Sequence, residues 1–93
     1  MSSSGGGYIR IRRVKPSPGQ LVMHIINSVG SSLEAGTAAA FVSNMLGDGT
    51  ISESSAKLIR AATSDSALRP VPQQYRDEVR AAIFKQMLIT IIS

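Results

Sequence analysis

The 93-residue chain contains no cysteine, no tryptophan and a single histidine, His24. The absence of cysteine excludes disulfides, thiolate metal sites and thiol catalysis, and one histidine excludes a histidine-rich metal site. We therefore expect no metal and no cofactor. The sequence also lacks an apolar run of the roughly 20 residues that a membrane-spanning helix needs. It shows no signal-peptide pattern either, so we expect a soluble protein without a membrane span.

A catalytic constellation is also missing. His24 falls beside apolar residues at helical spacing, and we interpret it as a half-buried structural side chain. Asp77 and Glu78 are adjacent, so on a helix their side chains point about 100° apart and cannot act as a pair. No serine is marked by a neighbouring base as an activated nucleophile. The sequence therefore predicts a protein that is not an enzyme.

The size of the chain limits how it can be stabilised. Its apolar fraction of 43% is that of a globular protein. A chain this short forms one domain, and small domains are usually reinforced by disulfides, metals or oligomerisation. The first two are excluded by composition, so we predict a homo-oligomer.

The net charge of +4 is confined to one segment, which we call the basic arm (residues 8–15). The basic arm holds Arg10, Arg12, Arg13 and Lys15 and no acid, whereas residues 16–93 carry six cations and six acids. A neutral body with one concentrated positive segment indicates a polyanionic partner, most commonly nucleic acid. The choice between DNA and RNA stays open.

Helix signals divide the rest of the chain. Residues 1–16 are interpreted as a Ser/Gly-rich leader followed by the basic arm, and residues 17–93 as a helical domain. The predicted fold is all-α, a small four-helix bundle. Its helices are expected at about 18–29, 32–46, 51–63 and 72–91.

Two of the predicted helix starts are read as capping boxes, Ser31 with Glu34 and Thr50 with Glu53. Gly30, between the first two helices, is read as a helix stop.

Apolar residues at helical spacing predict the buried faces. In the last helix the predicted core stripe is Tyr75, Val79, Ile83 and Met87, and Ala82, Phe84 and Leu88 widen it. In the third helix Leu58 is among the residues expected inside.

The basic arm has several possible structures. Ile9 and Ile11 alternate with arginines, as in an extended strand. This strand could pair with the β-branched residues 88–92, with a second subunit, or with an acidic protein partner. It could equally be a solvated edge whose charges prevent aggregation. Residues 88–92 are compatible with helix or strand.

The predicted oligomer interface has three parts. Gly36 and Ala40 form a smooth patch where a second helix could approach closely, and the apolar end of the chain provides a second surface. Together with the isoleucines of the arm, the candidate interface residues are Ile9, Ile11, Gly36, Ala40, Leu88, Ile91 and Ile92. The alternative for the apolar end is that it fills the core of its own subunit.

These observations favour a self-associating nucleic-acid-binding protein of the packaging or nucleoprotein type. Its candidate phosphate contacts are Arg10, Arg12, Arg13, Lys15, Lys57, Arg60, Arg76 and Arg80.

Two other functions remain open. One is a helical protein–protein interaction module whose arm adds to a partner. The other is a helix-turn-helix DNA-binding regulator, in which residues 33–46 and 51–63 form the motif and Lys57 and Arg60 face the groove.

Overall fold

The computed structural model describes residues 18–92, and the basic arm lies outside the described residues. Four helices follow one another: α1 (Pro18–Val29), α2 (Ala35–Gly47), α3 (Glu53–Thr63) and α4 (Gln73–Ile92). No strand occurs between residues 18 and 92. The prediction of an all-α, four-helix protein is confirmed, and residues 88–92 belong to a helix.

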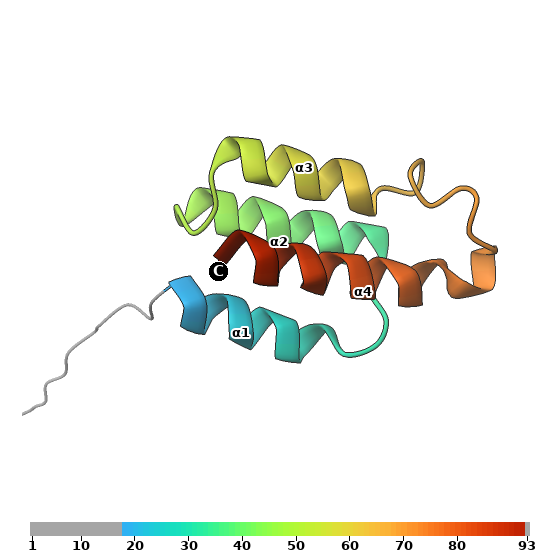
Figure 1. The fold of residues 1–93 in the computed structure, drawn as a ribbon, viewed down its shortest axis with the longest axis horizontal. Helices are drawn as coiled ribbons and strands as arrows, with labels where there is room; N and C mark the ends of the chain where they lie inside the picture. Colours follow the sequence, from blue (N-terminus) through green and yellow to red (C-terminus); the bar gives the residue numbers. More distant parts are fainter. Residues whose placement is uncertain (1–17, 93) are drawn as a thin grey trace, which may run out of the picture.

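The helices alternate in direction, and α4 lies between α1 on one side and the α2–α3 pair on the other (Figure 1). No helix between residues 18 and 92 is long and apolar enough to cross a membrane.

Apolar side chains from all four helices meet in one core. Phe84 and Leu88 of α4 are completely buried, as are Val42, Met45 and Ile59 of α2 and α3. Complete burial of a large apolar side chain stabilises a protein by roughly 1.5–3 kcal/mol relative to leaving that side chain exposed. The full set of core residues is Val22, Ile25, Val29, Leu33, Ala38, Val42, Met45, Ile51, Ala56, Ile59, Ala81, Phe84 and Leu88.

The end of α1 agrees with its sequence signal. The helix stops at Val29, and Gly30 follows with φ of 69°. This left-handed conformation is favoured by glycine, which has no Cβ to clash with the backbone.

The predicted start of α2 is wrong. Ser31 and Glu34 form no capping box: the helix begins only at Ala35, and Glu34 makes no side-chain cap hydrogen bond. The physical reason is a tertiary contact. Leu33 is buried, and its backbone N–H donates to the carbonyl of Asp77 at 3.0 Å, which ties the α1–α2 loop to α4.

The start of α3 is also displaced from its prediction. Ser52, not Thr50, is the N-cap residue, and its Oγ accepts from the backbone N–H of Ser55 at 3.1 Å. Thr50 instead donates its own N–H to the carbonyl of Met45 at 2.9 Å, which continues the turn that ends α2.

The buried face of α4 differs from the predicted stripe. Arg80, Ala81, Phe84 and Leu88 point into the body. Phe84 and Leu88, which were predicted to widen the stripe, are thus confirmed as core residues, whereas of the four residues of the stripe itself only Met87 packs against the core and Tyr75 is 49% exposed. Both sides of this helix are apolar, so periodicity alone does not determine which side faces inward.

Arg80 determines the orientation of α4. It is the largest fully buried side chain between residues 19 and 92, with 1% exposure. Its Nε donates to the carbonyl of Thr63 at 2.7 Å, and its Nη1 donates to the carbonyl of Leu33 at 2.9 Å. Its guanidinium also pairs with Asp77, at 2.6 Å, and with Asp65. One side chain therefore joins α4 to the α1–α2 loop, to the end of α3 and to the loop that follows.

Replacing this guanidinium tests its structural role. We expect Arg80→Met to lower the free energy of unfolding by about 3 kcal/mol, because the carbonyls of Thr63 and Leu33 lose their donor and an unsatisfied buried polar group costs about 1–3 kcal/mol. Asp65 and Asp77 contribute less, because both carboxylates are exposed enough to be hydrated. The measurement is urea unfolding followed by circular dichroism.

The matched control is Arg76→Met, one turn earlier on the same helix. Arg76 is only partly buried, and it donates to the carbonyls of Val71 and Arg69. We expect a loss of about 1 kcal/mol for its hydrogen bonds. Equal effects of the two substitutions would contradict the special role of Arg80.

A second prediction concerns the cap of α3. Ser52→Ala should lower the free energy of unfolding by about 1 kcal/mol, because the Ser55 N–H loses its acceptor. Thr50→Ala is the control and should change stability much less. The opposite order in the same urea experiment would show that Thr50 is the functional cap.

Candidate functional site

The basic arm and its isoleucines are not among the described residues. The arm cations Arg10, Arg12, Arg13 and Lys15, and the interface candidates Ile9 and Ile11, all precede residue 18. Their proposed roles therefore rest on the sequence.

The body cations lie in different environments. Lys57 and Arg60 are exposed on α3, where Arg60 donates to the hydroxyl of Ser43 on α2 at 3.4 Å. Arg76 is partly engaged, because its Nε donates to the carbonyl of Val71 at 2.8 Å. Among the candidate phosphate contacts of the body, Lys57 and Arg60 are therefore the best placed to meet a polyanion.

Arg80 does not fit its predicted role as a phosphate contact. Its guanidinium is buried and donates to two backbone carbonyls and two carboxylates of its own fold. A phosphate could not reach it without opening the core. The sequence signal was misleading because an arginine in a polar stretch of helix resembles a surface residue.

The predicted interface residues also separate. Leu88 is completely buried in its own subunit, which corrects its assignment to a subunit interface. Ile91 and Ile92 are half-buried and pack against the same core. Gly36 and Ala40 are exposed on α2, and a Cβ built at Gly36 would meet no atom within 4 Å. The apolar end of the chain therefore packs mainly into the core of its own subunit, as the alternative prediction stated.

One side of α4 is an apolar surface, although the sequence predicted that most of its residues would be buried. We call this side, which points away from the core, the α4 outer face. Tyr75 and Ile89 are 49% and 45% exposed, and the residues between them on this side are exposed or half-buried. Its members are Tyr75, Val79, Ala82, Ile83, Gln86 and Ile89, none of which is charged.

Two further exposed apolar side chains belong to helices that contact α4. Met23 of α1 is 52% exposed, and Leu58 of α3, which was predicted to be buried, is 62% exposed. A Cβ built at Gly19 would lie 3.9 Å from Ile92. The helices α1 and α4 run antiparallel (Figure 1), and Met23, one turn after Gly19, lies on nearly the same side of α1 as Gly19.

Leu58 belongs to α3, which also contacts α4. Arg60 reaches α2 through Ser43, and Leu58 is about 200° away from Arg60 around α3, so it is turned away from Ser43.

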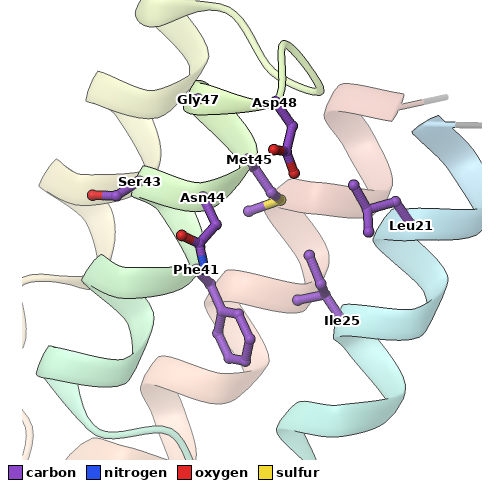
Figure 2. A pocket seen from close by; sticks show the side chains of 8 residues that line it. All are labelled: Leu21, Ile25, Phe41, Ser43, Asn44, Met45, Gly47 and Asp48. Carbon is purple, nitrogen blue, oxygen red and sulfur yellow. The ribbon is translucent and has the colours of Figure 1, made fainter. Parts of the chain in front are cut away.

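A groove separates α1 from α2. Figure 2 shows Leu21 and Ile25 on the α1 side and Phe41, Asn44 and Met45 on the α2 side. The cavity has a volume of about 560 Å³ and is open to the surface. Its polar lining side chains are Ser43, Asn44 and Asp48, and they form no set of nucleophile, base and orienting group. No cluster of three metal-ligating side chains exists among residues 19–92.

The proposed helix-turn-helix is not formed by α2 and α3. The two helices lie side by side and run in opposite directions (Figure 1). In a helix-turn-helix they would cross at roughly 90–120°. Lys57 and Arg60 therefore lie on an ordinary helical hairpin.

His24, the single histidine, is exposed on α1, contrary to the expectation of a half-buried residue. It has no acidic or nucleophilic partner that would suggest chemistry. The fold and these surfaces define a small helical interaction domain.

The family assignment agrees with this class. Residues 17–89 match the family described as the CtsR C-terminal dimerization domain. The chain belongs to this family. The family is one of transcriptional regulators, which confirms the expectation of a protein that is not an enzyme.

Curated relatives extend the match. The chain is similar to the transcriptional regulator CtsR of Geobacillus stearothermophilus, with 32% identity over 88 residues, and to that of Bacillus subtilis (strain 168), with 33% identity over 88 residues. These matches cover 94% of this chain but only 57% and 56% of the relatives. The chain therefore spans little more than half the length of the regulators it matches.

A solved structure shares the fold. The model superposes with a TM-score of 0.77 on a chain from the crystal structure of CtsR in complex with a 26bp DNA duplex, at 23% identity. The similarity covers 87% of this chain and 52% of that chain.

The curated matches include part of the basic arm. A match over 94% of the chain is longer than residues 17–93, so it must extend into residues 1–16. The family model, by contrast, begins at residue 17. The arm therefore resembles a part of the regulators that precedes their dimerization domain.

Proposed function

We propose that this chain is the self-associating part of a DNA-binding transcriptional regulator, and that its basic arm contributes phosphate contacts. The observation that carries the proposal is the match of residues 17–89 to a dimerization domain. The sequence favoured a nucleic-acid-binding protein of the packaging type. We now favour a transcriptional regulator, because the relatives are named as regulators.

DNA is the favoured polyanion. The structure with the shared fold is that of a protein bound to a DNA duplex, and the arm holds four cations without an acid. Cations of this kind release counterions from DNA, which gives affinity without sequence readout. Sequence specificity would then be supplied outside this chain. An acidic protein partner for the arm has no support from the relatives.

Self-association can be measured directly. We expect the full chain to show twice its 9.8 kDa mass in light scattering coupled to size exclusion at micromolar concentrations. Dilution should shift the mass towards the monomer, since a small interface dissociates at low concentration. A single-chain mass at every concentration up to the millimolar range would contradict the proposal.

The arm is tested by neutralisation. Replacing Arg10, Arg12, Arg13 and Lys15 together by glutamine should weaken binding to duplex DNA at low salt. The wild-type affinity should fall with salt with a logarithmic slope of at most about −3.6 per chain, as four phosphate contacts predict. Fluorescence anisotropy of labelled duplexes at two salt concentrations measures both effects.

The control for this experiment keeps the arm and changes the body. Lys57→Gln combined with Arg60→Gln removes the two exposed cations of α3 and should lower affinity less than the arm substitution. Light scattering must show the same mass for all variants. DNA binding that is unchanged in the arm variant would refute the role of the arm and leave self-association untouched.

A further inference from the structure

The α4 outer face has the length and composition of a helix–helix contact. Tyr75 and Ile89 are 14 residues apart, which places them on the same side of α4 and about 21 Å apart along its axis. Both are large apolar side chains with roughly half of their surface exposed. Val79 and Ile83 lie between them and are not part of the core cluster. The inner side of the same helix is fully used by the core, so this face is additional to it.

The order of residues along the face is compatible with two-fold symmetry. Ala82 lies midway between Tyr75 and Ile89, and it is exposed. We infer that two copies of this chain associate through their α4 outer faces, with the α4 helices antiparallel and the two-fold axis at Ala82. In this arrangement the Tyr75 of one copy meets the Ile89 of the other, as an isologous contact requires. A small residue at the crossing point allows the helices to approach closely.

The helices on either side of α4 also expose apolar side chains. Met23 of α1 and Leu58 of α3 are 52% and 62% exposed, and both helices contact α4. Tyr75 and Ile89, the other two exposed large apolar side chains between residues 19 and 92, lie on the α4 outer face itself. Exposed apolar surface marks interaction sites in soluble proteins.

Charge favours a second copy as the occupant. The members of the α4 outer face carry no ionisable group apart from the Tyr75 phenol, and the exposed Glu78 and the half-buried Lys85 lie along one edge of it, about 40° and 60° from Ala82 around the helix. Antiparallel pairing about Ala82 would place the Glu78 of one copy near the Lys85 of the other, so charges of opposite sign would meet along this edge. In its own subunit Lys85 donates to the carbonyl of Gly30, which places this edge on the α1 side. The inference rests on the proposed self-association and adds its surface and symmetry.

The competing surface lies on α2. Gly36 and Ala40 are exposed, and because α2 and α4 contact each other, their outward sides point in opposite directions. The α2 side presents small residues and therefore buries less apolar area per residue. A closed dimer needs only one self-complementary surface, so the two faces give different predictions.

A charge placed on each face distinguishes them. Ala82→Glu puts a carboxylate at the proposed axis, where it would meet its own copy, and should shift the dimer to monomer with at least a tenfold weaker association constant. Ala40→Glu is the matched control on α2 and should leave the mass unchanged. Both positions are exposed on helices and accept glutamate, and circular dichroism should show that both variants stay folded. Light scattering over a dilution series measures the masses.

Cysteine crosslinking tests the symmetry without weakening the contact. The chain has no cysteine, so Ala82→Cys introduces a single thiol. Across a two-fold axis it would lie next to itself, and mild oxidation should give a covalent dimer, because a disulfide needs Cα atoms within about 7 Å. Ala40→Cys should stay mainly uncrosslinked under the same conditions.

The outcomes separate this inference from the proposed function. If the wild-type chain is a dimer that Ala40→Glu dissociates and Ala82→Glu does not, or if Ala40→Cys crosslinks in place of Ala82→Cys, the α4 surface is wrong and self-association stands. If the wild-type chain is a monomer throughout, both fail. Dissociation by Ala82→Glu together with crosslinking of Ala82→Cys supports the surface and its symmetry.

Discussion

The buried guanidinium of Arg80 is the contact on which the arrangement of the helices depends. It is held by the carbonyls of Thr63 and Leu33 and by the carboxylates of Asp65 and Asp77. A buried cation is costly unless it is paired and its hydrogens are satisfied, so each of these partners must stay in place. Thr63 is the last residue of α3, and the carbonyl end of a helix carries partial negative charge that favours a cation. The ends of three helices are thereby joined at one point.

This constraint also explains why one apolar side of α4 is left outside. With Arg80 directed inwards, Phe84 and Leu88 follow it at helical spacing into the core. Tyr75, which lies on the opposite side of the helix, is then turned outwards. Replacing the ion pairs by apolar groups would often be neutral for stability, so the buried charge is better understood as fixing the rotation of α4. The rotation of α4 about its axis thus determines which apolar side chains of this helix are exposed to a partner.

The sequence was a good guide to the helices and to the buried faces of α1 and α2, and a poorer guide to the buried face of α4. The bounds of α1 and the helix stop at Gly30 follow from local signals, which tertiary contacts do not oppose. The capping box at Ser31 failed because the N–H of Leu33 bonds to the carbonyl of Asp77, a partner far away in the chain. Local signals cannot show such a contact.

The centre of the buried face of α4 was misplaced for a related reason. Apolar residues occur both in the stripe containing Tyr75 and in the stripe containing Phe84, and a polar residue usually marks the outside. In α4 the polar residue Arg80 lies on the buried side of the helix, so it gives the wrong orientation. The interface candidates Gly36 and Ala40 were chosen for their small size, whereas exposure, which only the fold gives, identifies the α4 outer face. The charge asymmetry of the chain, in contrast, is a property of the sequence alone.

The basic arm and the proposed dimer are connected by geometry. The first described residues of α1 lie against Ile92, since a Cβ at Gly19 would be 3.9 Å from that side chain. In an antiparallel pairing of α4 about Ala82, the two Ile92 residues lie on opposite sides of the axis, about 30 Å apart along the helix direction. The two chains would therefore enter their helical bodies at points separated by nearly one turn of duplex DNA, about 34 Å. Two neutral bodies joined in this way would separate the points at which their cationic arms begin. If the arms contact DNA as proposed, the symmetry of the helical domain would set the spacing between those contacts.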